Sequence, residues 1–165
     1  GQQCYEVPVG FKYISAKMAE TNAVIGGESS GGLAVRGHIA GKDGIYAAAL
    51  LVEMLAVTGK SVSQLYQEIT DKYGMLYYED AAFTMTQARK VELQEKLFVK
   101  LEVPDFGNAV EKINRTDGCK VYFTDGSWVI CRFSGTEPLL RMAAEGESQS
   151  QARTYIRIWR EELGL

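Results

Sequence analysis

Apolar residues in the first part of this chain fall mostly at helical spacing. They recur every three or four positions over residues 11–20, which predicts a helix. A second helix is predicted over residues 45–57, a run in which nearly every residue is apolar. Asp43 stands where the second helix needs an N-cap, and Gly59 stands where that helix ends. A third helix is predicted after Ser61, because Ser61 begins a Ser-x-x-Gln capping box and the apolar residues that follow share one face.

Glycine-rich stretches interrupt this helical pattern twice. Residues 23–25 predict a short buried strand, and glycine-rich runs follow it at residues 26–32 and 37–44. The spacing of apolar residues changes after the third helix. We therefore predict two small units that meet there, residues 1–74 and residues 75–165.

Apolar and polar residues alternate over much of the second part, which predicts strands. The predicted extended segments are residues 75–86, 120–123, 128–133 and 139–145. Asp125-Gly126 favours a tight hairpin turn between two of them, because glycine tolerates a positive φ. Helices are predicted over residues 87–100 and after Ser148, with a second short helix between Pro104 and Asn114. This order of strands and helices predicts a compact α+β unit.

Composition and charge narrow the class of protein. With 165 residues, 46% of them hydrophobic and 24% charged, the chain has the make-up of a soluble globular protein. A net charge of -3 provides no strong basic field, so we predict neither nucleic acid nor membrane as a partner. The three cysteines lack CxxC spacing, which favours reduced thiols over disulfides or zinc. No apolar run approaches ~18 residues, and no secretory leader pattern is present, which predicts a cytoplasmic protein.

The run Arg-Phe-Ser-Gly-Thr-Glu-Pro at residues 132–138 has the composition of a phosphate-binding loop. Arg132 supplies a planar fork of donors, Ser134 and Thr136 add hydroxyl groups, and Gly135 lets backbone amides approach an anion. Arg141, in the strand that follows, is placed to converge on the same anion. An ordinary surface turn beside a solvated arginine is equally compatible with this spacing.

Glu137 is the unexpected residue of this loop. A carboxylate beside a bound phosphate repels it, so Glu137 either points away or pairs with Arg132 or Arg141 when the site is empty.

The glycine-rich loop at residues 27–32 suits a sugar ring. The Glu28 carboxylate accepts hydrogen bonds from vicinal hydroxyls, and Ser30 donates or accepts beside it. A loop with no ligand is the more common explanation for such a composition. Lys42 is a candidate phosphate contact or acid/base group, although most lysines at helix starts are simply solvated. His38, the only histidine, is expected to have a structural or surface role.

Four motifs together resemble a known family. They are Val-Gly-Phe-Lys-Tyr-Ile at residues 9–14, Gly-Glu-Ser-Ser-Gly at 27–31, Gly-Lys-Asp-Gly at 41–44, and the run at 132–138. In order and spacing they resemble the α-D-phosphohexomutases, which include phosphoglucomutase and phosphomannomutase. The resemblance implies that residues 1–74 form most of the family's third domain, an α/β domain. It also implies that residues 75–165 form the fourth, a small α+β domain of the TATA-box-binding-protein type.

The resemblance also implies roles for individual residues. Glu28 and Ser30 would bind the sugar hydroxyls. The phosphate of the substrate would be held by Arg132, Ser134, Gly135, Thr136 and Arg141. Lys42 is the first candidate for an acid/base group and Lys12 the second. Gly32 stands where some subgroups carry His, which favours a phosphoglucomutase-like member.

The reaction implied for an intact enzyme interconverts hexose 1-phosphate and hexose 6-phosphate through a bisphosphate, which also serves as activator. The family's phosphoserine loop and its Asp-rich Mg²⁺ loop lie in the first two domains, and no segment here resembles either. We therefore expect a C-terminal piece of a phosphohexomutase, inactive alone, with its metal ligands and N-terminal domains elsewhere. The alternatives are a phosphomannomutase or phosphoglucosamine mutase piece, and a stand-alone phosphosugar-binding module without chemistry.

Overall fold

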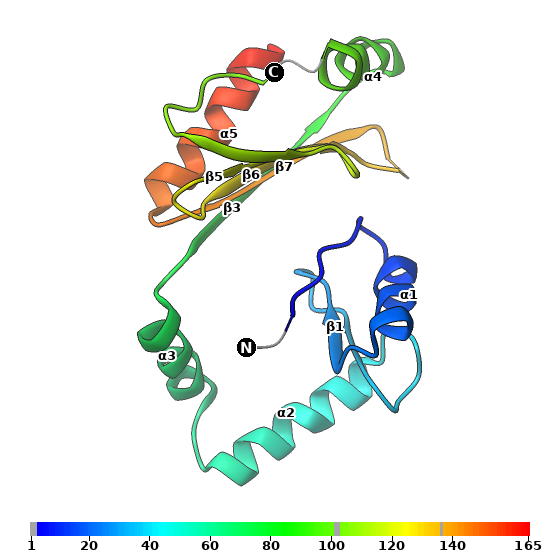
Figure 1. Ribbon diagram of the computed structural model, residues 1–165, viewed down its shortest axis with the longest axis vertical. Helices are drawn as coiled ribbons and strands as arrows, with labels where there is room; N and C mark the ends of the chain where they lie inside the picture. The colour runs from blue at the N-terminus through cyan, green and yellow to red at the C-terminus, as the bar shows by residue number, and fades with distance from the viewer. Residues whose placement is uncertain (1–2, 101–102, 136) are drawn as a thin grey trace. The chain divides into compact units, whose positions relative to one another are not determined.

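The computed structural model describes residues 3–100, 103–135 and 137–165 (Figure 1). The chain divides into two compact units, Gly1–Tyr73 and Gly74–Leu165. This division lies one residue before the one expected from the spacing of apolar residues. Each unit is described by itself below.

Unit 1 combines three helices with a small β-hairpin. Its elements are α1 (Phe11–Thr21), β1 (Ile25–Gly27), β2 (Leu33–Val35), α2 (Gly44–Thr58) and α3 (Val62–Tyr73). The caps expected from the sequence are present at α2. The Asp43 carboxylate accepts hydrogen bonds from the backbone N–H groups of Ile45 and Tyr46, both at 3.0 Å, and Gly59 ends the helix in the left-handed conformation.

The predicted capping box of α3 is also confirmed. The Ser61 backbone N–H donates to Gln64 Oε1 at 2.8 Å, and the Gln64 N–H donates to Ser61 Oγ at 3.3 Å. The prediction of a buried strand at residues 23–25 is wrong in burial and in the position of the strand. The strand is Ile25–Gly27, an antiparallel partner of β2, and Ile25 is 61% exposed.

The core of unit 1 is small. Among the described residues, its only buried apolar side chains are Ile14 and Ala34. Helix α2 is apolar over most of its surface, yet Ile45, Val52 and Val57 are 87%, 66% and 79% exposed. The apolar face of α2 is therefore uncovered within this unit.

Unit 2 is an antiparallel sheet covered on one face by helices (Figure 1). Its elements are β3 (Tyr77–Thr84), α4 (Gln87–Gln94), the π-helical turn η1 (Glu95–Lys100), β4 (Val110–Asn114), β5 (Cys119–Phe123), β6 (Trp128–Phe133), β7 (Leu139–Gly146) and α5 (Gln149–Leu163). The strand order is β3-β7-β6-β5-β4. Alternate residues of β5, β6 and β7 are fully buried, as the period-2 pattern predicted, and they pack with α4, η1 and α5 in one core.

The helix predicted between Pro104 and Asn114 is wrong. Residues Val110–Asn114 form the edge strand β4, which pairs with β5 through a register shift between Val110 and Lys112. Valine and isoleucine three residues apart match a helical face, but as β-branched residues they also favour a strand, and a free edge of β5 was available to pair.

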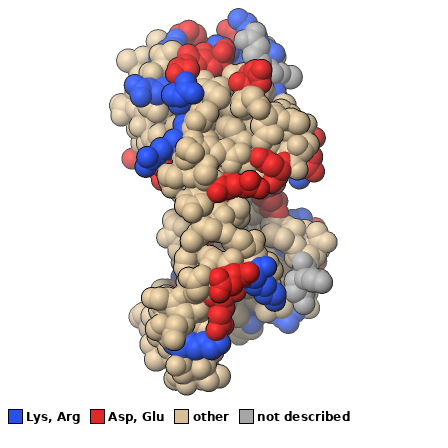
Figure 2. Space-filling view, turned by 90° about the vertical axis from the view of Figure 1, so that its left-hand side faces the viewer, with Lys and Arg blue, Asp and Glu red and all other residues tan. Residues whose placement is uncertain are grey.

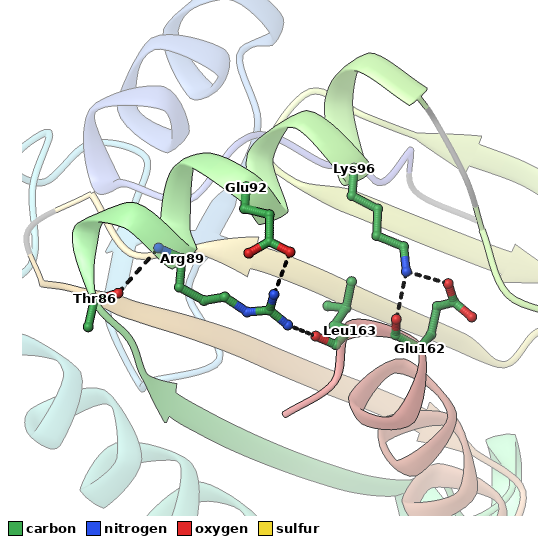
Figure 3. A network of polar contacts seen from close by, with 6 residues as sticks. All are labelled: Thr86, Arg89, Glu92, Lys96, Glu162 and Leu163. Carbon is green, nitrogen blue, oxygen red and sulfur yellow. Dashed lines mark hydrogen bonds and ion pairs between the residues drawn. The ribbon is translucent and has the colours of Figure 1, made fainter.

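Side-chain contacts hold α4 and η1 to the C-terminal end of α5 (Figure 3). Arg89 donates to the Leu163 carbonyl oxygen and pairs with Glu92 at 2.6 Å. Lys96 Nζ donates to the Glu162 carbonyl oxygen at 2.7 Å and pairs with the Glu162 carboxylate at 2.6 Å. Cations at the last carbonyls of a helix oppose its negative pole, so these contacts fix both helices on the same face of the sheet.

The two core cysteines are free thiols on adjacent strands. Cys119 in β5 stands opposite Cys131 in β6, and both are completely buried. Burial, and then the neighbouring Cys119, raises the pKa of the Cys131 thiol. A thiol that is buried and protonated reacts slowly.

No single helix in the described ranges is long and apolar enough to cross a membrane; α2 and α3 reach that standard only when counted together across a bend of 82°. Figure 2 shows acidic and basic side chains interspersed over the face in view.

Candidate phosphosugar-binding site

The first candidate loop joins β1 to β2 in unit 1. The Glu28 N–H donates to the Gly32 carbonyl oxygen and the Gly31 N–H donates to the Glu28 carbonyl oxygen, both at 2.9 Å. Gly31 has a φ of 93°, a conformation that other residues rarely adopt. This closed turn fixes the backbone of Glu28 and leaves Ser30 exposed at its tip.

Lys42 lies against Glu28. Its Nζ donates to Glu28 Oε2 at 2.9 Å and stands 5.4 Å from the centre of the Phe11 ring. The Glu28 side chain is 18% exposed and that of Lys42 is 54% exposed. The structure thus brings together two residues that the sequence analysis singled out separately, a carboxylate and an ammonium group that both reach solvent.

A pocket of about 260 Å³ opens beside this pair. It is lined by Ser30, Gly31, Gly32, Leu33, Lys42, Asp43, Gly44 and Ala47. The pKa of the Asp43 carboxyl is held below its ordinary value, first by the hydrogen bond from the Tyr46 N–H and then by the hydrogen bond with His38 at 2.9 Å. His38 itself stacks on Tyr46, with ring centres 4.0 Å apart, so its observed contacts are structural.

Lys12 is placed differently. It is exposed in the first turn of α1, and its ammonium lies 4.8 Å from the centre of the Tyr13 ring. Over the described part of the chain, no hydrogen bond or ion pair joins it to Glu28 or Lys42. The geometry therefore favours Lys42 over Lys12 as the lysine of this pocket.

The second candidate loop joins β6 to β7 in unit 2. The Ser134 N–H donates to the Leu139 carbonyl oxygen at 2.8 Å, and the Leu139 N–H donates to the Glu137 carbonyl oxygen at 2.8 Å. Ser134 is only 6% exposed, and its Oγ accepts a hydrogen bond from the Glu137 N–H at 3.2 Å. Gly135 is exposed at the tip. Thr136, the other predicted phosphate contact, lies outside the described residues.

The register of the sheet places Arg132 directly opposite Arg141 at the base of this loop. Directly paired residues of an antiparallel sheet have Cβ atoms about 4.5–5.5 Å apart, so the two side chains leave the sheet beside each other. Both lie on the face opposite the buried Cys131 and Met142, and therefore on the face that the described helices of unit 2 leave uncovered. Glu137 pairs with Arg141 at 2.8 Å, one of the two arrangements expected from the sequence.

Lys90 of α4 is a neighbour of the loop that sequence reasoning missed. Its Nζ lies 3.4 Å from the Ser134 carbonyl oxygen and 5.8 Å from the centre of the Phe133 ring. Nothing in the spacing of α4 marks this lysine, because its proximity arises only from the packing of the helix against the sheet.

The two loops offer different chemistry. Two arginine side chains at the base of an exposed turn suit an anion of two negative charges. A carboxylate and an ammonium group beside a serine hydroxyl suit a polyhydroxylated ring. Among the described residues, no group of three or more His, Cys, Asp or Glu side chains is arranged to hold a metal ion.

Comparison with known proteins shows which family these two units belong to. Residues 1–73 match the family model "Phosphoglucomutase/phosphomannomutase, alpha/beta/alpha domain III". Residues 85–158 match "Phosphoglucomutase/phosphomannomutase, C-terminal domain". The chain belongs to the phosphohexomutase family and contains the counterparts of these two domains.

Individual relatives show how much of the family's length is present. A phosphoglucomutase/phosphomannomutase of Thermococcus kodakarensis is 34% identical over all 165 residues, which are 33% of its own length. A phosphoglucosamine mutase of Desulforamulus reducens is 27% identical over 94% of this chain and 31% of its own. A Thermus thermophilus crystal structure assigned as a phosphomannomutase superposes with a TM-score of 0.70 at 26% identity, over 96% of this chain and 30% of that one. The chain thus spans about a third of the length of these relatives.

Proposed function

We propose that this chain is the part of a phosphohexomutase that holds the substrate while phosphate is exchanged elsewhere. The intact enzyme would interconvert hexose 1-phosphate and hexose 6-phosphate through a bisphosphate intermediate. The observation that carries the proposal is the direct pairing of Arg132 with Arg141 at the mouth of a glycine-containing turn.

The paired arginines form the proposed phosphate clamp. Two like charges directly opposite each other in a sheet are destabilising, and a phosphate dianion between them turns this repulsion into attraction. The backbone of Gly135, exposed at the tip, and the hydroxyl of Thr136 complete the clamp in this proposal. Ser134 is buried and accepts from Glu137, so its first contribution is to hold the shape of the turn.

The pocket of unit 1 is the proposed site for the sugar ring. Glu28 and Ser30 would read its hydroxyls, since a carboxylate accepts from two vicinal hydroxyls and a serine completes the set. Lys42 would act as the acid/base group, because it lines the pocket in which the sugar ring is proposed to lie. Lys12 remains the second candidate for that role.

Other parts of the polypeptide would supply the chemistry. In this proposal the ligands of the family's Mg²⁺ lie in the other domains. Two observations support the presence of further domains in the intact enzyme. The apolar face of α2 is uncovered, and the chain spans only about a third of the length of its relatives. In this proposal the chain alone is inactive even with Mg²⁺ and a hexose bisphosphate activator, and the enzyme is cytoplasmic.

The particular hexose phosphate is a separate proposal. Gly32, in place of the His of some subgroups, favours a phosphoglucomutase-like enzyme. The Desulforamulus reducens relative is a phosphoglucosamine mutase, which supports that substrate as the alternative, beside mannose phosphate. Assays of the full-length enzyme on the three hexose phosphates separate these substrates. A stand-alone binding module without chemistry predicts turnover on none of them.

Titration of the ¹⁵N-labelled chain with glucose 1-phosphate tests the clamp. The backbone amide signals of Ser134, Gly135 and Thr136 are expected to shift, and Arg132→Ala is expected to abolish the shifts because one of the paired guanidinium groups is gone. Arg157→Ala is the matched control, since Arg157 is an exposed arginine of α5. Shifts confined to other residues contradict the clamp, and measurable mutase turnover by the chain alone contradicts the division of labour between domains.

A further inference from the structure

The phosphate loop carries its own carboxylate. Glu137 lies three residues after Ser134 and pairs with Arg141 at 2.8 Å. Arg141 is the residue directly opposite Arg132, so the Glu137 carboxylate neutralises one member of a pair of like charges. A phosphate group held by the same arginines would need the same guanidinium donors.

The Glu137 side chain can leave Arg141 without disturbing the turn. The Glu137 backbone is fixed at both ends: its N–H donates to Ser134 Oγ at 3.2 Å, and its carbonyl oxygen accepts from the Leu139 N–H at 2.8 Å. Its side chain is 53% exposed and that of Arg141 is 44% exposed. Exposed ion pairs of this kind are weak and exchange readily with other ions. Rotation of one side chain therefore suffices to free Arg141.

We propose that Glu137 is an internal counter-anion that occupies Arg141 in the empty site and is displaced by the phosphate group of the substrate. This inference rests on the proposed function of the loop. It adds that Glu137 competes with phosphate for Arg141. Glu137 reduces the repulsion between Arg132 and Arg141 while the site is empty. It also lowers the affinity of the clamp, because each phosphate that binds must first break the pair with Arg141 and then remain near the displaced carboxylate.

A weakened clamp fits the reaction. The intermediate of a phosphohexomutase has to turn around in the site, so the phosphate that is held must also be released. An internal anion that replaces phosphate on Arg141 lowers the barrier to release, because the guanidinium is never left without a partner.

Phosphate affinity of the Glu137→Gln variant tests this inference. Gln has the shape of Glu but no charge, so the turn keeps its hydrogen bonds while Arg141 loses its ionic partner. The probe is inorganic phosphate, titrated into the full ¹⁵N-labelled chain at constant ionic strength, with the dissociation constant taken from the Gly135 and Arg141 amide shifts. The expected result is tighter binding by about 3- to 10-fold, which corresponds to about 0.7–1.4 kcal/mol.

Glu161→Gln is the matched control. Glu161 pairs with Arg157 at the same four-residue separation, at 2.9 Å, and both side chains are similarly exposed, at 63% and 59%. The control removes the same unit of charge from an ion pair on α5. Its phosphate affinity is expected to stay within twofold of the unchanged chain.

The outcomes separate the inference from the function on which it rests. Tighter binding by Glu137→Gln but not by Glu161→Gln supports the internal counter-anion. Equal or weaker binding by Glu137→Gln, with clear shifts in the unchanged chain, overturns it and leaves the clamp in place. Equal gains in both variants also overturn it, because only net charge then matters. If phosphate shifts no signal of the loop in any of the three proteins, the clamp itself is wrong.

Discussion

Gly32 shows how the absence of a side chain can shape the pocket of unit 1. A Cβ atom at this position would lie 2.6 Å from Lys42 Cδ and 3.0 Å from Glu28 Oε2. Lys42 therefore reaches Glu28 through the space that a side chain at position 32 would occupy. Because a lysine side chain is flexible, Gly32→Ala is expected to displace Lys42 rather than to unfold the unit. The predicted result is loss of the Lys42–Glu28 contact, read from the shift of the Lys42 ammonium signal in a ¹H–¹⁵N correlation.

Gly41→Ala provides the comparison for that substitution. Gly41 precedes Lys42, but a Cβ there meets open space and the backbone is not in the left-handed region. Its Lys42 signal should match that of the unchanged chain. An unaltered Lys42 signal in Gly32→Ala would mean that the lysine reaches Glu28 by another path.

At the scale of elements, a polar network ties the β5–β6 turn to α5. Tyr155 is 3% exposed, and its hydroxyl oxygen accepts from Asn108 Nδ2 at 3.0 Å and from Gln151 Nε2 at 2.9 Å. It also lies 3.0 Å from Ser127 Oγ, which donates to Asp125 at 2.5 Å. Burial raises the pKa of the Asp125 carboxyl, but hydrogen bonds, chiefly from Ser127, outweigh it and leave that pKa below its ordinary value.

Tyr155→Phe is expected to destabilise unit 2. The variant keeps the ring but removes the oxygen on which two amide donors and a buried serine converge. An unsatisfied buried polar group costs about 1–3 kcal/mol, so the free energy of unfolding should fall by about that amount. Urea titration followed by tryptophan fluorescence measures it. Tyr77→Phe, at a partly exposed tyrosine of β3, should change it by less than about 0.5 kcal/mol, and an equal effect of both would dismiss the network.

Local chemistry explains which elements could be predicted from the sequence. Asp43, Ser61 and Ser148 satisfy helix N–H groups within three residues of themselves, so their caps are visible in a short window of sequence. The strand β4 and the exposure of Ile25 depend on which distant segments lie alongside, and no local window contains that information.

In the candidate site, too, local features could be predicted from the sequence and distant contacts could not. The loops at Glu28 and Arg132 were visible as motifs, because glycine, serine and charged residues cluster within a few positions. Their partners were less visible: Lys42 reaches Glu28 across 14 residues of chain, and Lys90 reaches the Ser134 carbonyl across 44. The pairing of Arg132 with Arg141 required the register of β6 and β7, which the turn between them sets.

At the scale of the whole molecule, the two units differ sharply in how much apolar surface they bury. The sheet and helices of unit 2 share one continuous core, whereas the described buried apolar residues of unit 1 are Ile14 and Ala34. Because burial of apolar surface is the main favourable term in folding, unit 1 should have much the smaller free energy of unfolding. We expect it to unfold at lower urea concentration than unit 2.

The distribution of tryptophan makes this difference measurable in the full chain. Both tryptophans, Trp128 and Trp159, belong to unit 2, while helices α1, α2 and α3 place a large share of the helical signal in unit 1. Circular dichroism at 222 nm should therefore lose part of its amplitude before tryptophan fluorescence changes. Hydrogen exchange resolved by residue should show α2 less protected than β6. Coincident transitions by both probes would contradict independent units, because they would require the small core of unit 1 to be stabilised by unit 2 as strongly as unit 2 stabilises itself.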